Sequence, residues 1–157
     1  MDYLVRFIST FFFLGYFPKI PGTIGTLGGL ILYILLNNFF SFNVYVMCIF
    51  TFILIIVSII SSSYAIKLFN NNDPKEVVID EVAGYFVSVL FLPFDYNLII
   101  IAFILFRLFD IYKPFLVKKL EDLKGGLGIT LDDVGAGVLT NISVSYTHLT
   151  LPTKRIV

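Results

Sequence analysis

Apolar residues fill long runs of the chain, and short polar or proline- and glycine-containing stretches separate these runs. Five runs are expected to be helical, at about residues 23–36, 44–63, 80–92, 98–111 and beyond residue 133. The second run reaches the ~20 residues that a helix needs to cross a bilayer. We therefore predict an all-α fold, a polytopic membrane bundle of four to five short helices.

The N-terminal residues 1–16 predict a segment of another kind. They hold one acid and one base, followed by an apolar patch and no small-residue cleavage site. This pattern is unlike a cleaved signal peptide and is typical of an amphipathic helix at the membrane interface. The side chains expected to enter lipid are Phe7, Phe11, Phe12, Phe13 and Leu14.

Residue counting along the third and fourth runs predicts that polar residues meet on one side of the bundle. Asp80 lies thirteen residues before Pro93, and Asp110 lies thirteen residues after Asn97. Since each helical residue rises ~1.5 Å, the two carboxylates should lie at a similar depth. Alternation of the runs places three further segments on this side, namely residues 21–26, residues 67–75 and the Asp132–Asp133 pair.

Composition and charge agree with a membrane protein of one domain. The 157 residues are 58% hydrophobic and 14% charged, and the mean hydropathy is +0.94. The formal net charge of zero gives no indication of a nucleic-acid partner, so none is expected, and no oligomeric state is assigned. The expected polar side carries seven lysines, whereas the opposite turns carry no Lys or Arg. The positive-inside rule then predicts a multi-pass protein of the cell (inner) membrane with its active face in the cytoplasm.

Five carboxylates form the candidate metal site: Asp80, Glu81, Asp110, Asp132 and Asp133. Crowded carboxylates repel one another unless a cation holds them, and an all-oxygen set without His or Cys suits Mg2+. Neighbouring residues on a helix point about 100° apart, so one acid of each adjacent pair is expected to face the ion. The hypothesis is a site formed by Asp110, by Asp132 or Asp133, and by Asp80 or Glu81. The alternative is that these acids cap helix ends and form ion pairs with Arg107 and nearby lysines.

Two cations and two glycine-containing segments are candidates for binding phosphate. Arg107 offers a planar fork and Lys113 a point charge beside the acids. Residues 21–26 open a helix and supply Pro21, Gly22, Thr23 and Thr26, and the run 124–128 supplies Gly125 and Gly126. The alternative for these segments is close helix packing or a simple turn.

At these residues the chain resembles the phosphatidylglycerophosphatase A family of membrane-embedded phosphatases. The resemblance extends over about residues 12–141, and the third of its three blocks is the most specific. The blocks are Pro21–Thr26, Val78–Gly84, and Phe106–Pro114 continuing through Gly125–Gly137. Thr26 stands where Ser is expected, and it keeps the hydroxyl group.

The resemblance implies Mg2+-dependent hydrolysis of the terminal phosphate of phosphatidylglycerophosphate at the bilayer, with the five acids as the essential set. The residues disfavour two other enzyme classes. The single histidine, His148, leaves no well-placed nucleophile for a histidine-dependent lipid phosphatase, and the CDP-alcohol phosphotransferase signature is absent. The alternative function is a cation-binding membrane subunit or transporter whose acids line a path near mid-bilayer.

The C-terminal residues are expected to depart from the family. Residues 1–143 form the family-like membrane domain, and residues 144–157 form an atypical tail that is not native to it. The tail has no clear helical periodicity and contains Pro152. The last helix is therefore expected to be only about ten residues long, too short to span a bilayer.

Overall fold

The computed structural model describes residues 2–40, 43–121 and 123–150, which form seven α-helices, one 3-10 helix and no strand. The all-α prediction is confirmed. Two helices are long and apolar enough to cross a membrane, α2 over Pro21–Phe39 and α3 over its whole length. The elements in chain order are α1 (Asp2–Ser9), η1 (Leu14–Tyr16), α2 (Pro21–Phe40), α3 (Val44–Phe69), α4 (Ile79–Val89), α5 (Tyr96–Tyr112), α6 (Phe115–Glu121) and α7 (Gly126–Thr150).

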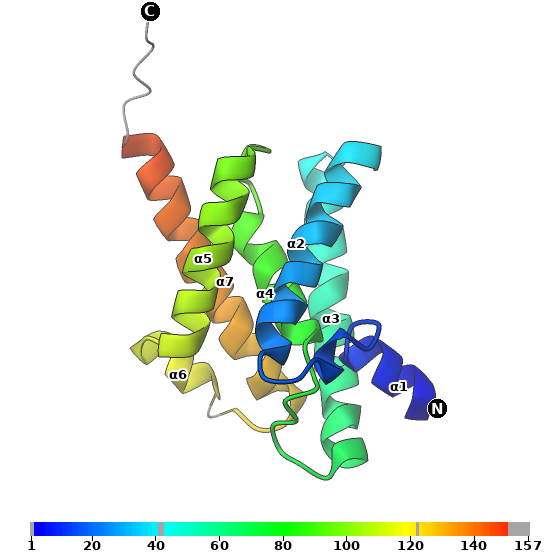
Figure 1. Cartoon of the computed structure of the whole chain (residues 1–157). Helices are drawn as coiled ribbons and strands as arrows, with labels where there is room; N and C mark the ends of the chain where they lie inside the picture. Colours follow the sequence, from blue (N-terminus) through cyan, green and yellow to red (C-terminus); the bar gives the residue numbers. More distant parts are fainter. Residues whose placement is uncertain (1, 41–42, 122, 151–157) are drawn as a thin grey trace, which may run out of the picture.

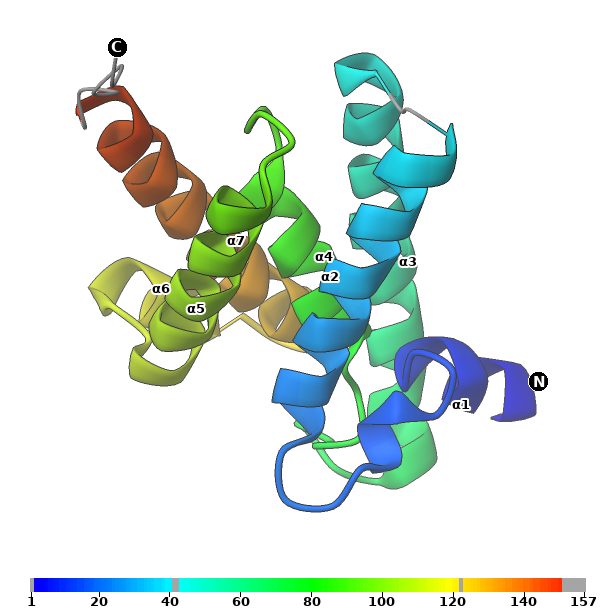
Figure 2. The same cartoon turned by 45° about the horizontal axis from the view of Figure 1, so that its top comes forward.

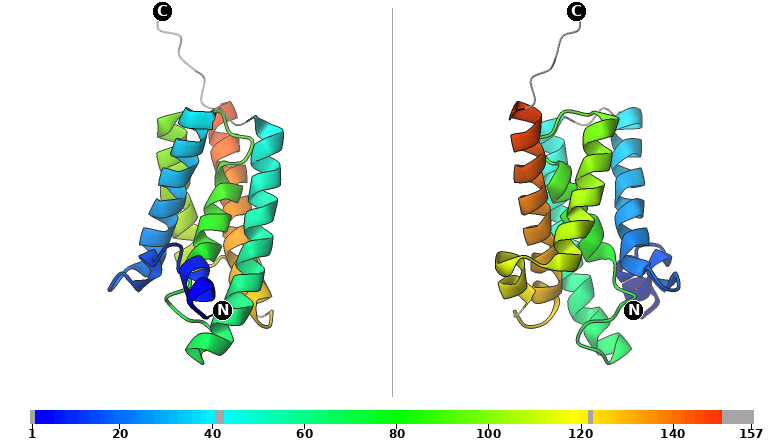
Figure 3. Two further views of the ribbon diagram at one scale, coloured as in Figure 1. Left: turned by 90° about the vertical axis from the view of Figure 1, so that its right-hand side faces the viewer. Right: turned by 60° about the vertical axis from the view of Figure 1, so that its left-hand side comes forward.

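Helix α4 lies at the centre of the bundle, where it contacts α2, α3, α5 and α7 (Figures 1 and 3). Apolar side chains project from several sides of this helix, so neighbouring helices can bury it on all of them. Val82, Tyr85 and Phe86 have no exposed surface at all. The first turn of this central helix is therefore held in a fixed place.

Glycines let α4 and α7 pack with their backbones almost in contact. A Cβ atom on Gly84 would lie 2.6 Å from the carbonyl oxygen of Asp133, and one on Gly137 would run into the carbonyl oxygen of Gly84. Small residues at a helix crossing allow this close approach. The crossing at Gly84 lies about one helical turn from Asp80 and brings the acids of α4 next to those of α7.

Asn141 on α7 caps the other end of α4. Its side-chain amide donates hydrogen bonds to the carbonyl oxygens of Ser88 at 3.1 Å and Leu90 at 2.5 Å, with a longer contact of 3.4 Å to Val87. The last carbonyls of a helix have no partner within the helix, so an outside donor stabilises its end. Asn141 thus allows a helix of only eleven residues to end within the bundle.

The N-terminal segment folds against the outside of α3 (Figure 2). Arg6 of α1 lies over the ring of Phe69 at 5.1 Å. Phe11, Phe12 and Phe13 all have positive φ, which turns the chain sharply and gathers aromatic rings, with Phe7 and Phe12 4.8 Å apart. Tyr3, Leu4 and Phe12 are exposed. An interfacial position in the membrane stays a prediction for this segment.

The C-terminal part differs from the expectation. The connector after α5 contains helix α6, and α7 begins before Asp132 instead of after it. The expected ten-residue final helix is wrong, since α7 has 25 residues and ends at Thr150. The helix continues here because Val144 is fully buried against the bundle. The polar side chains are accommodated because their hydroxyls bond to the helix's own carbonyls, as Ser143 does with Leu139 at 2.8 Å. The proposed family boundary at residue 143 stays a prediction, and residues 151–157 lie outside the described part.

Candidate active site

A cavity of about 740 Å3 is lined by residues from α2, α4, α5 and α7. Helices α2, α4 and α7 begin at this end of the bundle, and α5 ends there (Figure 1). Most of the predicted site residues line it. They are Pro21, Gly22, Asp80, Glu81, Arg107, Asp110, Lys113, Gly125, Asp132 and Asp133. The predicted meeting of these distant segments at one end of the bundle agrees with the structure.

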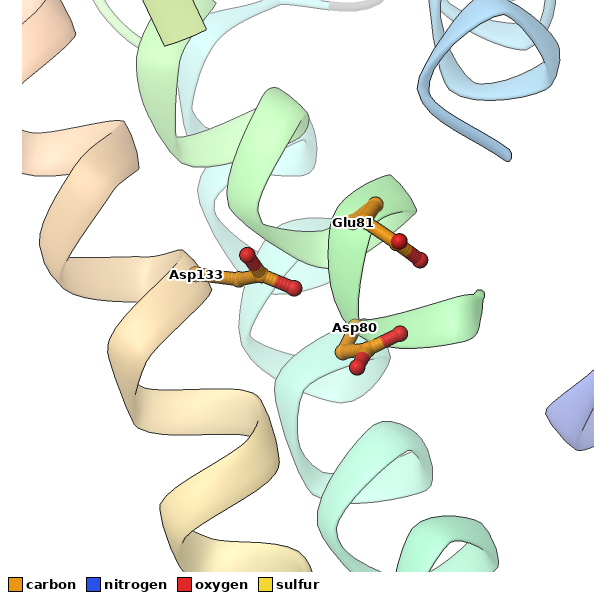
Figure 4. A group of neighbouring side chains, drawn as sticks. All are labelled: Asp80, Glu81 and Asp133. Atoms are coloured by element: carbon orange, nitrogen blue, oxygen red, sulfur yellow. The ribbon is translucent and has the colours of Figure 1, made fainter. Parts of the chain in front are cut away.

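Three of the five acids form a close group, which we call the carboxylate centre: Asp80, Glu81 and Asp133. One carboxylate oxygen from each lies within 4.8 Å of the others. Asp133 projects from α7 toward the turn of α4 that carries Asp80 and Glu81 (Figure 4). Asp80 is 6% exposed and Asp133 is 4% exposed. The three acids are thus crowded together, with Asp80 and Asp133 buried and Glu81 half-buried.

The start of α4 is anchored from outside the helix. The Val78 amide donates a hydrogen bond of 2.9 Å to the carbonyl oxygen of Ser9, and the side chains of Val77, Val78 and Ile79 are buried. Asp80 and Glu81 follow directly in the first turn, where the helix dipole favours negative charge. The anchor and the dipole hold both carboxylates at the cavity.

The other two acids are bound to cations. Asp132 accepts a hydrogen bond from Lys113 Nζ at 2.8 Å on one oxygen and from the Asp133 amide at 3.0 Å on the other. Asp110 accepts a hydrogen bond of 2.5 Å from Arg107 Nη1, three residues earlier on α5. Ion pairing, the alternative considered from the sequence, therefore describes these two acids.

The carboxylate centre fits a hard divalent cation. Asp80 Oδ1 and Glu81 Oε2 are buried and have no hydrogen-bond partner in the described part of the chain. Buried charges without partners are costly, and a cation would relieve both that cost and the repulsion among the three acids. Carboxylate oxygens are the ligands that Mg2+ prefers. The residues that could hold it are Asp80, Glu81 and Asp133. Asp110 and Asp132 each already have one oxygen paired with a cation.

Three residues predicted to bind substrate do not line the cavity: Thr23, Thr26 and Gly126. Thr26 is fully buried, and its hydroxyl contacts Arg107 instead. Gly126 lies in the first turn of α7, where a Cβ atom would run into Ile59 and Ser63 of α3. Gly125 does line the cavity, and its φ of +74° makes the turn that leads into α7.

The sequence analysis missed site residues from the loop between α3 and α4. Asn72, Asp73, Pro74 and Lys75 line the cavity. Lys124, the first residue of the run 124–128 considered for phosphate binding, lines it as well. The signal was available, because this loop was placed on the polar side of the bundle. No local pattern in the sequence indicates that this loop lines the cavity together with the acids.

Comparison with known proteins gives one consistent family. The family model described as phosphatidylglycerophosphatase A matches residues 7–148. A Bacteroides thetaiotaomicron protein, provisionally named a phosphatidylinositol-3-phosphatase, is 36% identical over 92% of this chain and 93% of its own length. A Haemophilus influenzae protein named phosphatidylglycerophosphatase A is 30% identical over 89% of this chain and 86% of its own length. An Escherichia coli protein of the same name is 29% identical over 80% of this chain and 73% of its own length.

No solved structure matches the chain. The family model spans nearly all of the described residues, including the carboxylate centre, both ion pairs and the crossing of α4 and α7. The resemblance noted from the three sequence blocks is confirmed. The chain belongs to the phosphatidylglycerophosphatase A family and is a phosphatase.

Proposed function

We propose that the chain hydrolyses the terminal phosphomonoester of phosphatidylglycerophosphate and releases phosphatidylglycerol and inorganic phosphate, with Mg2+ as its cofactor. The observation that carries the proposal is the carboxylate centre, whose buried and unpartnered oxygens lie in the same cavity as Arg107 and Lys113. Family membership and the names of two relatives support the substrate.

Asp80, Glu81 and Asp133 would hold the ion. Bound there, Mg2+ would neutralise phosphate charge and polarise the phosphate or the attacking water. A carboxylate oxygen left free by the ion would position that water and take its proton. As the new phosphorus–oxygen bond forms, the ester bond to glycerol breaks, and the glycerol oxygen takes up the proton that the carboxylate removed from the water.

Arg107 and Lys113 would bind the phosphate oxygens. Each is already held at the cavity by an acid, Arg107 by Asp110 and Lys113 by Asp132. Arginine matches phosphate with a planar fork, and lysine adds a mobile positive charge. In this proposal Asp110 and Asp132 position the two cations and do not coordinate the ion.

The chain is proposed to be a multi-pass protein of the cell membrane. Helices besides the two long apolar ones also expose large apolar side chains, which water would not favour but lipid would. On α5 and α7 these side chains are Ile100, Ile104, Ile111, Val138 and Ile142. The cavity end carries lysines and would face the cytoplasm.

A cation transporter is less favoured by the same geometry. A transport path needs acids along a route through the bilayer, whereas the five acids line a single cavity. Asp80 and Glu81 lie in the first turn of α4, and Asp110 lies in the last turn of α5. A phosphoinositide substrate has one specific observation in its favour, the name of the Bacteroides relative. Both lipid substrates carry a phosphomonoester on a polyol headgroup, so they can be compared in one assay.

The test is phosphate release by the purified chain in detergent from phosphatidylglycerophosphate, phosphatidylinositol 3-phosphate and phosphatidic acid. We expect release from phosphatidylglycerophosphate that needs Mg2+ and stops when EDTA is added. Faster phosphate release from phosphatidylinositol 3-phosphate would identify the phosphoinositide as the preferred substrate and would leave the proposed active site unchanged. Release that continues in EDTA would contradict the metal-dependent mechanism, and no release from a folded chain would contradict the proposed function.

A further inference from the structure

The Arg107 guanidinium is enclosed by residues from two helices. On its own helix, Asp110 accepts a hydrogen bond from Nη1. From α2, the hydroxyl of Thr26 accepts a second, longer hydrogen bond from the same nitrogen at 3.4 Å. Thr26 is 81 residues distant in sequence and has no exposed surface. A contact between the start of α2 and the phosphate-binding arginine is thus built into the core.

The Thr26 hydroxyl has its orientation set by α2. It donates its single proton to the Gly22 carbonyl oxygen at 2.9 Å. A hydroxyl has one donor and two acceptor lone pairs, so the side facing Arg107 can only accept. The Thr26 hydroxyl oxygen is thus a fixed acceptor directed at the Arg107 guanidinium, which can only donate hydrogen bonds.

Gly22 brings this turn of α2 up to the arginine. A Cβ atom there would lie 3.3 Å from Arg107 Nη1 and 3.2 Å from Nη2, and it would run into the Glu81 carboxylate. The glycine therefore lets Thr26, Arg107 and the carboxylate centre lie side by side without a gap.

We infer that Thr26 is a positioning residue that aims Arg107 at the phosphate of the substrate. The inference rests on the proposed function, in which Arg107 binds phosphate. An arginine held in place before substrate arrives loses less freedom on binding and places its donors where charge develops. The competing explanation is local, because buried helical threonines commonly bond to the carbonyl four residues earlier with no further role.

The experiment combines Thr26→Val, which keeps the shape and removes the hydroxyl, with Arg107→Lys, singly and together. Inorganic phosphate is the probe, and calorimetry on the Mg2+-loaded chain in detergent gives its affinity. We expect Thr26→Val to weaken phosphate binding about fivefold, from loss of one hydrogen bond to a charged group, and to have less than about a twofold effect in the Arg107→Lys background. Thr26→Ser should bind phosphate as the wild type does.

Thr140→Val is the matched control. Thr140 is also fully buried, and its hydroxyl bonds to Ala136 O at 2.8 Å, four residues earlier. This variant should keep the wild-type phosphate affinity. Equal weakening by Thr26→Val in both arginine backgrounds, no weakening, or failure of serine to substitute would each overturn the inference. Failure of the proposed function would look different, as a wild-type chain that binds phosphate through Arg107 but releases none from phosphatidylglycerophosphate.

Discussion

At the scale of residues, the five acids are equivalent in the sequence and unequal in the structure. Asp80, Glu81 and Asp133 keep oxygens within reach of a shared ion, whereas Asp110 and Asp132 are bound to Arg107 and Lys113. Neutralising a carboxylate that binds a metal should weaken metal binding. Neutralising one that positions an arginine should instead weaken the binding of the phosphate substrate. Substitution by the isosteric amide separates the two roles.

Asp110→Asn is expected to raise the KM for the lipid about tenfold and to leave Mg2+ affinity within about threefold of wild type, because it weakens the hold on Arg107. Asp80→Asn is the comparison, and it should lose Mg2+ binding. The measurements are steady-state kinetics and Mg2+ titration on both variants. An Asp110→Asn variant that no longer binds Mg2+ would place this acid among the ligands.

Part of this division could be read from the sequence. Arg107 and Asp110 are three residues apart, a spacing that puts two helical side chains on one face, so their pairing was foreseeable. The pairing of Lys113 with Asp132 depends on how α5 and α7 meet, and the Thr26 contact depends on the placement of α2. Helical periodicity does not determine such distances between helices, so the sequence leaves the role of each predicted site residue open.

At the scale of elements, the crossing of α4 and α7 sets the spacing of the carboxylate centre. Gly84→Ala should separate the two helices, because its Cβ would meet the Asp133 carbonyl and the Phe106 ring, both closer than 3 Å. A displacement of ~1 Å at a reacting centre can cost about 100-fold in rate, so we expect a loss of at least about tenfold in kcat/KM.

Gly29→Ala is the control for that substitution. Its Cβ would lie 3.3 Å from the nearest atom, on Val82, which requires a much smaller shift. This variant should keep most of its activity. If both variants were equally active, the α4–α7 crossing would not determine the spacing of the acids.

The cap on α4 predicts an effect on stability alone. Asn141→Leu removes the donor to the carbonyls of Ser88 and Leu90. Leaving buried acceptors unpaired costs about 1–3 kcal/mol, so Tm in detergent should fall while kcat per folded chain stays unchanged. Ser143→Ala, which loses only a bond within α7, should have a smaller effect on Tm. An unchanged Tm for Asn141→Leu would contradict the capping role.

Helix α7 also shows where composition misleads. Its C-terminal half is rich in Ser and Thr, which have low helix propensity. The absence of clear helical periodicity there and the presence of Pro152 predict an early end to the helix. The structure satisfies Ser143 and Thr147 within the helix and buries Val144 against the bundle. Tertiary packing overrides the local preference of these residues.

At the scale of the whole molecule, the apolar runs predicted the helices well and the turns between them poorly. Helices α2, α3, α4 and α5 each lie over a predicted run and differ from it by a few residues at their ends. The sharp N-terminal turn is held by local hydrogen bonds, such as that of 3.1 Å from the Phe13 amide to the Thr10 hydroxyl. Helix α6 packs against α7, and the loop between α3 and α4 lines the cavity with residues of other helices. The sequence does not encode such contacts in any local pattern.

The predicted orientation in the membrane can be tested with single cysteines. Cys48 is the one cysteine of the chain, so Cys48→Ser gives an empty background. We expect Lys118→Cys, at the cavity end, to react with an impermeant maleimide only from the cytoplasmic side and Asn97→Cys, at the opposite end, only from outside. Both positions are exposed. Labelling of both from one side would contradict the spanning arrangement.

The most direct test of the central claim is equilibrium Mg2+ binding to the wild-type chain, Asp133→Asn and Asp132→Asn. The two substitutions are chemically identical and one residue apart, but only Asp133 belongs to the carboxylate centre. We predict one bound Mg2+ per chain for the wild type and Asp132→Asn, and none for Asp133→Asn at the same concentration. Binding retained by Asp133→Asn and lost by Asp132→Asn would contradict the assignment of the metal site.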